Sequence, residues 1–237
     1  MTLNVSAGDA IQKFDQANRL YEQGQFAEAA AAYQGLAASG AGTATVFYNL
    51  GNAWFKAGQL GRAVAAYRQA EKLEPRDPNI RFNLNFARKQ VTGSDAPEPA
   101  LWQRCLTRLT VNEWAVLASC GLWLWFLSLI LREFRPALGR TLRGYTATLG
   151  VVAVGLAAAL GVAMREQIQA HEAVVVAPQA VVRFGPLEDS KVNYQLRDGS
   201  EVVVLDEKRL NPSESWLQVR DASRRVGWLK RDEVIIL

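Results

Sequence analysis

Residues 44–77 read ATVFYNLGNAWFKAGQLGRAVAAYRQAEKLEPRD, and the same order of large and small side chains begins 34 residues earlier, at residue 10. The residues that recur are Gly24, Ala29 and Tyr33, which return as Gly58, Ala63 and Tyr67. Each copy has room for two helices joined at its glycine, and the alanines let those helices approach closely. Residues 10–43 and 44–77 therefore predict two tandem helix–turn–helix units.

A third helix is predicted over residues 79–91, because Asp77 and Pro78 form a typical helix start. No partner helix follows it, so we expect a capping helix over the apolar face of the second unit. Its apolar residues are Ile80, Phe82, Leu84 and Phe86. The helical repeat domain then spans residues 10–91.

Residues 10–91 resemble tetratricopeptide repeats. The likeness is specific in the second unit, which reads Phe47-x2-Leu50-Gly51-x2-Trp54, then Ala63-x3-Tyr67, then Pro75. It is looser in the first unit, where Gln16, Ala17 and Leu20 replace Leu50, Gly51 and Trp54. The resemblance implies a scaffold that binds other proteins in a groove lined by the first helix of each repeat.

Four asparagines are the candidate groove residues. Asn18 and Asn52 share one repeat position, and Asn83 repeats the position of Asn49. Asparagine both donates and accepts hydrogen bonds, so such a row can bind an extended peptide; contacts between the repeat's own helices are the alternative. Repeats that clamp a C-terminal carboxylate have asparagines at the positions of Asn18 and Asn49. The basic residues of that clamp are replaced here by Phe14, Asn79 and Asn83.

Two uncharged stretches, residues 114–131 and 145–164, are each long enough to cross a bilayer as a helix. They predict transmembrane helices over residues 112–132 and 144–165; a buried helical pair is the alternative. Residues 92–111 are predicted as a linker and an interfacial helix. The connection at residues 133–143 is rich in arginine, so the positive-inside rule puts it in the cytoplasm and both soluble parts in the periplasm.

The second apolar stretch carries small residues on one helical face, at Gly150, Ala153, Ala157 and Gly161. Small residues permit close contact between helices in lipid. The face is predicted to pack either against the first span or against a partner's helix.

Residues 1–9 are predicted as an N-terminal tail. Export of the repeats needs a signal peptide, and Val5-Ser6-Ala7 resembles a cleavage site. We therefore expect the tail to be the remnant of a signal peptide that starts upstream.

Residues 172–237 change to short β-branched runs separated by turns, which predicts a small all-β barrel. They resemble a bacterial SH3-like domain through Val182-Arg183-x-Gly185-Pro186 and Gly227-Trp228-Leu229. Phe184 and Tyr194 lie near loops and are the candidates for an exposed contact surface.

The fold class is therefore multidomain: tetratricopeptide repeats, a transmembrane helical hairpin and a small SH3-like barrel. This order resembles the E-type proteins of the Bacteroides aerotolerance operon. The resemblance implies a bacterial inner-membrane location and partners that include von Willebrand A-domain proteins and a MoxR-type ATPase. A membrane-anchored adaptor that recruits proteins is the predicted function. The alternatives are an envelope sensor whose SH3-like domain binds peptidoglycan peptides, a hydrolase accessory, and a cytoplasmic chaperone dock.

Charge and composition argue against other classes. The net charge is +3 over residues 1–93, +2 over 94–143 and −1 over 144–237, so the middle excess reflects the arginines that flank the spans. Nucleic-acid binding is not expected. The single histidine, His171, and the two cysteines, Cys105 and Cys120, form no metal-binding spacing. No enzymatic activity, metal or cofactor is predicted.

Overall fold

The computed structural model describes residues 7–93, 109–135, 139–169, 172–211 and 214–237. The chain divides into two compact units. One contains the helical repeats and the C-terminal sheet, and the other is the segment between them in the sequence. The predicted fold class is confirmed, since helical repeats, two apolar helices and a curled antiparallel sheet are all present. The tail before residue 7, most of the linker at 92–111 and the predicted interfacial helix lie outside the described residues.

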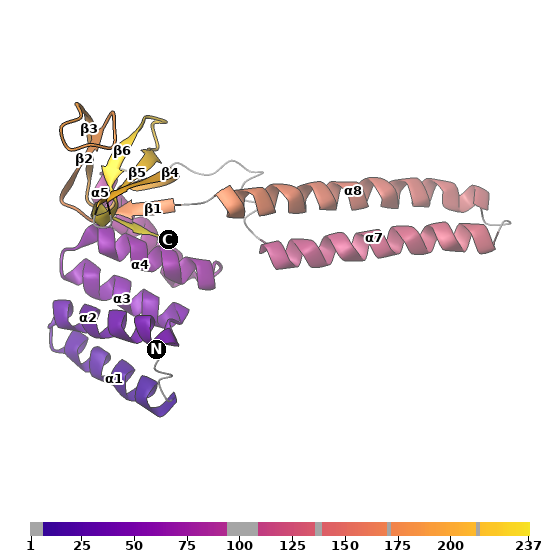
Figure 1. Ribbon diagram of the computed structural model, residues 1–237. Coiled ribbons are helices and arrows are strands. Elements are labelled where there is room, and N and C mark those ends of the chain that lie inside the picture. The colour runs from indigo at the N-terminus through magenta and orange to yellow at the C-terminus, as the bar shows by residue number, and fades with distance from the viewer. Residues whose placement is uncertain (1–6, 94–108, 136–138, 170–171, 212–213) are drawn as a thin grey trace. The chain divides into compact units, whose positions relative to one another are not determined.

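The repeats consist of α1 (Ala7–Glu22), α2 (Phe26–Leu36), α3 (Ala44–Lys56), α4 (Leu60–Leu73) and α5 (Pro78–Thr92). Gly24 and Gly58 form the turn within each pair, and both have a φ of 77°, which strains any residue with a β-carbon. Asp77 caps α5, as predicted, by accepting hydrogen bonds from the backbone of Asn79 and Ile80. Figure 1 shows α1 to α4 stacked in chain order.

The capping helix α5 presents two faces. Ile80, Leu84 and Ala87 are spaced at one helical turn and are buried against the repeats. Phe82 and Phe86 lie on the other face and are exposed, with 70% and 45% of their surface accessible. Ile80, Leu84 and Ala87 therefore form the face of α5 that packs on the repeats, and Phe82 and Phe86 lie outside that face.

The C-terminal sheet has seven antiparallel strands in the order β3-β2-β6-β5-β4-β1-β7. Its long strand β4 contains two register shifts, which are devices that bend a sheet. The core includes Val182, Leu217, Val219 and Leu229, all fully buried. The strand bounds are β1 (Glu172–Val175), β2 (Gln179–Arg183), β3 (Val192–Arg197), β4 (Glu201–Asn211), β5 (Glu214–Arg220), β6 (Val226–Lys230) and β7 (Val234–Ile236).

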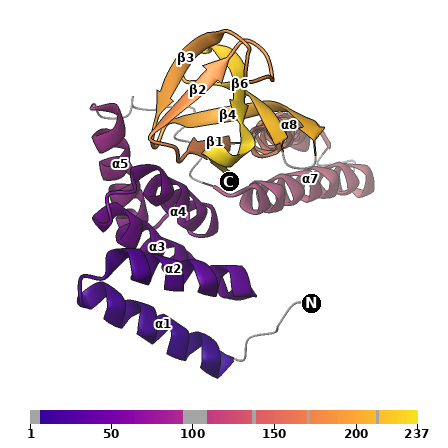
Figure 2. The ribbon, with the colours of Figure 1, turned by 60° about the vertical axis from the view of Figure 1, so that its left-hand side comes forward.

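The sheet packs directly on α4 and α5, as Figures 1 and 2 show from two sides. Val174 of β1 is fully buried in a cluster with Val64 of α4 and Leu84 of α5. Two repeats and one helix are short for a repeat array, which buries its core by stacking neighbours. The sheet supplies that missing neighbour, so the repeats and the sheet form a single packed body.

A loop of the sheet also binds the start of α4. The N-cap residue Gln59 makes no side-chain hydrogen bond to its own helix. Instead, the carboxylate of Asp198, in the turn between β3 and β4, lies against the backbone of Leu60 and Gly61 in the first turn of α4. Carboxylates are favoured at helix N-termini because the free N–H groups and the helix dipole both attract negative charge. Burial nevertheless raises the pKa of Asp198 above its usual value, against the lowering effect of the nearby backbone N–H groups.

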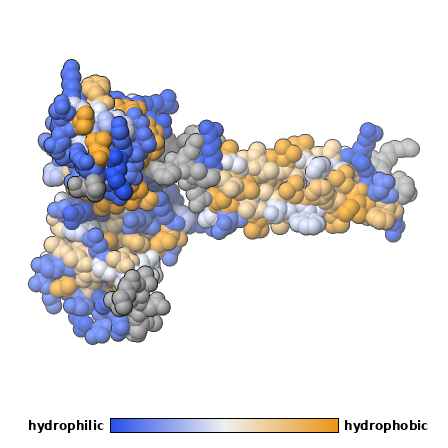
Figure 3. All heavy atoms as spheres, in the orientation of Figure 1, coloured by the Kyte–Doolittle hydropathy of each residue, from blue (hydrophilic) through white to orange (hydrophobic). Residues whose placement is uncertain are grey.

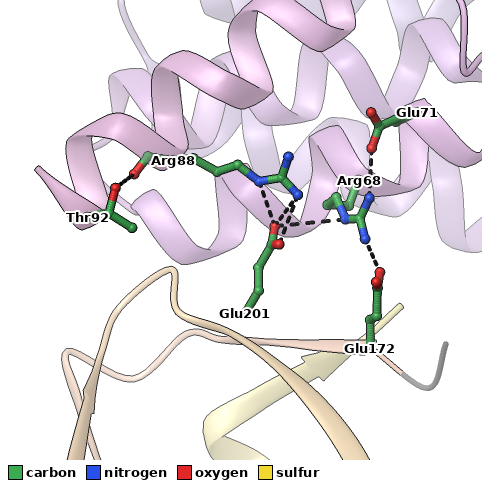
Figure 4. Close-up of polar contacts among 6 residues, drawn as sticks. All are labelled: Arg68, Glu71, Arg88, Thr92, Glu172 and Glu201. Atoms are coloured by element: carbon green, nitrogen blue, oxygen red, sulfur yellow. Dashed lines mark hydrogen bonds and ion pairs between the residues drawn. The ribbon is translucent and has the colours of Figure 1, made fainter. Parts of the chain in front are cut away.

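Ion pairs join the two parts beside this contact, as Figure 4 shows. Arg68 of α4 contacts Glu172 of β1, and its Nη1 lies 2.8 Å from Oε2 of Glu71. Arg88 of α5 binds Glu201 of β4, with Nη2 at 2.8 Å from both carboxylate oxygens. The Nε of Arg68 lies 3.8 Å from Oε1 of Glu201, so the two pairs form one network.

The second unit is an antiparallel pair of helices, α7 (Val111–Phe134) and α8 (Gly139–Gln169). Thr110 caps α7 together with Glu113, whose carboxylate accepts a hydrogen bond from the Thr110 backbone at 2.8 Å. The apolar stretches have mean hydropathies of 2.0 and 2.2, and only 11% and 6% of their residues are buried. Figure 3 shows apolar side chains along both helices. Both are long and apolar enough to cross a membrane.

Candidate functional site

The repeats contain a groove along α1, α3 and α5, made of two adjoining hollows. One hollow has a volume of about 120 Å³ and the other about 390 Å³, and both are bordered by Tyr21 and Asn52. We call this surface the inner groove. Its lining residues are Asn18, Tyr21, Glu22, Tyr33, Asn49, Asn52, Phe55, Lys56, Tyr67, Phe82, Asn83 and Phe86. All four predicted asparagines are therefore brought together.

Two of the asparagines make the same hydrogen bond in successive repeats. The hydroxyl of Tyr33 donates to Oδ1 of Asn18 at 2.5 Å, and that of Tyr67 donates to Oδ1 of Asn52 at 2.7 Å. Both tyrosines are buried on the second helix of their repeat. The side-chain oxygens thus hold the two helices of each unit together. Within the described residues, Nδ2 of Asn18 and of Asn52 makes no hydrogen bond, which leaves donors for a ligand.

Asn83 extends this network from the second repeat to α5. Its Nδ2 donates to Oδ1 of Asn52 at 2.9 Å and to the hydroxyl of Tyr48 at 3.0 Å. Asn49 lines the smaller hollow together with Tyr33, and its side chain lowers the pKa of that tyrosine against the larger effect of burial. Structural contacts and ligand binding are therefore compatible roles for the same asparagines, because an amide has more hydrogen-bonding sites than these contacts use.

Alkaline pH should weaken the fold through the two tyrosines. Burial raises the pKa of Tyr33 to about 12, and burial raises that of Tyr67 as well. Because the folded chain keeps these phenols neutral where the unfolded chain ionises, their stabilisation is complete below pH 10 and is lost as the pH rises through the folded pKa. The double variant Tyr33→Phe/Tyr67→Phe should flatten this decline, by up to about 1.4 kcal/mol per pH unit for each tyrosine. Urea unfolding between pH 8 and 11.5 measures it, and an unchanged slope would contradict the assignment.

The larger hollow ends in three phenylalanines that the sequence did not single out as a site. The rings of Phe82 and Phe86 are stacked with centroids 6.5 Å apart, and Phe55 lies 5.5 Å from Phe86. Asn52 and Asn83 stand beside them in the same hollow. An exposed aromatic cluster next to hydrogen-bonding groups is the composition of a protein-binding hot spot. The four-residue spacing of Phe82 and Phe86, out of phase with Ile80 and Leu84, was the available signal.

On the sheet, the two predicted surface residues differ in exposure. Phe184 has 62% of its surface accessible, and Leu187 of the same connection and Val192 at the start of β3 are also exposed. Tyr194 is buried instead, because the guanidinium of Arg225 lies 4.1 Å above its ring and its hydroxyl donates to the Arg225 carbonyl at 3.2 Å. The exposed apolar residues near these loops are Phe184, Leu187 and Val192, and Glu188, Asp189 and Lys191 are exposed in the same segment.

The predicted small-residue face of α8 divides into two parts. A β-carbon on Gly150 would lie 2.9 Å from Nε1 of Trp125, and Ala153 is fully buried beside Gly121 of α7. Ala157 and Gly161 are exposed, and a β-carbon on Gly161 would have no neighbour within 4 Å. The first half of the face packs within the hairpin, and the second half faces outward.

The described part of the chain offers few His or Cys side chains that could bind a metal ion or act as a nucleophile. Its His, Cys, Asp and Glu residues form no cluster of three that could hold a metal ion. His171 and Cys105 lie outside the described residues, and Cys120 is an exposed thiol on α7. Phe14, at a basic position of the carboxylate clamp, packs edge-on against Tyr33.

The tetratricopeptide repeat family has a model that matches residues 14–79, which run from within α1 to the start of α5. No curated protein matches the sequence. The predicted repeats are therefore confirmed over this part of the chain. Repeats of this family are generally protein-interaction modules, so the chain contains a tetratricopeptide array suited to binding protein partners.

Proposed function

We propose that the protein is a membrane-anchored adaptor without catalytic activity, which recruits protein partners through the inner groove. The observation that carries this proposal is the exposed pair Phe82 and Phe86 beside Asn52 and Asn83. A solvent-exposed surface of this kind stabilises a complex with a protein partner by burying the aromatic rings and by hydrogen bonds between the amides and the partner's backbone. The hairpin would hold the array at the membrane and raise the effective concentration of its partners there.

The proposed setting is a bacterial inner membrane, with the repeats and the sheet in the periplasm. Support comes from four arginines in or beside the connection between α7 and α8, which favour a cytoplasmic position for it: Arg132, Arg135, Arg140 and Arg143. The resemblance to E-type aerotolerance proteins adds von Willebrand A-domain proteins and a MoxR-type ATPase as proposed partners. Protease added to the outside of spheroplasts should then digest the repeats.

Removing the aromatic end of the inner groove should abolish recruitment. The full chain, captured from detergent-solubilised membranes, should retain A-domain membrane proteins, and Phe82→Ala/Phe86→Ala should lower their recovery on the order of tenfold to a hundredfold. Phe184→Ala removes an equally exposed ring from the sheet and serves as the matched control. Quantitative mass spectrometry of the captured proteins measures the difference. Unchanged recovery with Phe82→Ala/Phe86→Ala would overturn the groove as the recruiting site.

A second candidate function is an envelope sensor or anchor whose SH3-like sheet binds peptidoglycan peptides. The exposed apolar side chains of Phe184, Leu187 and Val192 favour it, because exposed apolar groups mark interaction surfaces. For this function Phe184→Ala is the test variant and Phe82→Ala/Phe86→Ala is the control. Phe184→Ala should reduce the retention of wall fragments, and Phe82→Ala/Phe86→Ala should leave it unchanged.

A further inference from the structure

The hairpin contains a cleft between its two helices, α7 and α8. It has a volume of about 580 Å³ and is lined by both α7 and α8. Arg132 and Arg143 border it, one from each helix, together with Trp125, Val151 and Val154. The cleft thus combines two guanidinium groups with an apolar wall.

The two arginines lie at one depth, near the connection between the helices. Arg132 is in the last turn of α7, and Arg143 comes four residues after the start of α8. Both stand at the ends of the apolar stretches, where lipid headgroups lie if the helices span a membrane. Figure 3 shows hydrophilic side chains gathered at that end of the hairpin. The bound group there would therefore be a headgroup rather than an acyl chain.

The cleft offers hydrogen-bond donors without a competing carboxylate. Its lining includes no Asp or Glu, and within the described residues neither Arg132 nor Arg143 forms an ion pair. The indole Nε1 of Trp125 also has no acceptor in the described part of the chain, although its ring packs over Gly150. A cleft lined by three hydrogen-bond donors and no acidic side chain favours an anionic ligand. Phosphate suits it, because one guanidinium can donate two parallel hydrogen bonds to phosphate oxygens.

Below the arginines the wall of the cleft is apolar. Val151 and Val154 have 75% and 66% of their surface accessible, and Gly150 provides no side chain between them and Trp125. Val154 is eleven residues beyond Arg143, which is about 16 Å along a helix. The cleft is thus long enough for half of an acyl chain beneath a headgroup.

We propose that this cleft binds one anionic phospholipid, with its phosphodiester between Arg132 and Arg143 and an acyl chain along Val151 and Val154. The inference rests on the membrane anchoring in the proposed function. It differs from the topological role of the arginines, since that role depends on their number and side of the membrane rather than on their place around a cleft.

Native mass spectrometry of the purified full chain tests the site. With added phosphatidylglycerol, the wild-type chain should retain one lipid, and it should retain phosphatidylcholine about tenfold less well. Arg132→Gln and Arg143→Gln should each weaken phosphatidylglycerol binding about tenfold, the scale of one charge-assisted contact. Val151→Trp, which fills the cleft and keeps both charges, should weaken it as well. An excess of inorganic phosphate should not displace the lipid.

Arg135→Gln is the matched control, because Arg135 is exposed, three residues from Arg132, and does not line the cleft. If Arg135→Gln weakened binding as much as Arg132→Gln, or if Val151→Trp had no effect, the cleft would not be the site. Equal retention of the two lipids would overturn the proposal too. A different result would refute the membrane anchoring itself: alkaline carbonate would extract the chain from membranes. If the chain resists this extraction but shows no lipid preference, only the proposed lipid site is refuted.

Discussion

Gly61→Ala should release the C-terminal sheet from the repeats while both parts stay folded. A β-carbon at this position would lie 2.2 Å from Oδ1 of Asp198 and 2.2 Å from the carbonyl oxygen of Val175. Neither atom can move far, since Asp198 lies in a turn closed by the hydrogen bond from Ser200 N to the Arg197 carbonyl, and the Val175 carbonyl accepts from Gly199 at 2.8 Å. We expect the contact to lose about 2–4 kcal/mol, in the range of severe overpacking.

Hydrogen exchange of the full chain measures this loss. Amides of β1 and of the first turn of α4 should exchange faster in Gly61→Ala, whereas those of α1 and of β5 should not. Gly35→Ala is the matched control: Gly35 lies within α2, and a β-carbon there would meet nothing within 4 Å. Alanine in a helix is favoured over glycine by roughly 1 kcal/mol, so the control should be slightly stabilised. Unchanged exchange at β1 would mean that the sheet does not dock through Gly61.

Arg68→Ala should destabilise the same contact by about 2–3 kcal/mol. Arg68 lies between Glu172 and Glu201, and its side chain is only 19% exposed. Burial lowers the pKa of Arg68, but Glu172, Glu201 and Glu71 together raise it by more, so the charge is retained in the folded chain. Without the guanidinium, two half-buried carboxylates would face each other with one fewer cation, which costs more than the pair itself contributes.

Chemical unfolding of the full chain, followed at a probe on the sheet, measures the effect. Arg81→Ala removes an exposed arginine of α5 and should change the unfolding free energy by less than about 0.5 kcal/mol. Adding Glu172→Ala to Arg68→Ala should recover part of the loss, because the unpaired carboxylate is then gone as well. A double variant as unstable as the sum of its singles would show that the two residues are not coupled.

The sequence was most informative where its signals were local. The 34-residue period, the turn glycines and the Asp77-Pro78 start all report on neighbours along the chain, and the helices begin and end close to where these residues stand. The same holds for the two apolar stretches and for the short β-branched runs. The repeat helices and the strands bury faces whose periodicity can be read from their own residues, whereas the two apolar helices are recognised by length and composition.

The docking of the sheet on the repeats could not be predicted in that way. Glu172 and Glu201 pair with arginines 104 and 113 residues earlier in the chain. In isolation, Asp198 and Gly199 read as an ordinary turn, and nothing local shows that the turn caps a helix. The buried Tyr194 was missed for a similar reason, since its cover comes from Arg225 on a later loop. Within the inner groove, the asparagines could be predicted from the repeat pattern. Phe82 and Phe86 could not, because their exposure depends on which face of α5 the rest of the protein covers.

The packed body that contains residues 7–93 and 172–237 has a consequence for the hairpin inserted between them. Both halves of this body must share one compartment, because the ion pairs and the Asp198 contact join them directly. A chain that leaves a compartment and returns to it crosses the intervening barrier an even number of times. If one of the two apolar helices traverses a bilayer, the other must do so as well, and an arrangement with a single crossing is ruled out by parity alone.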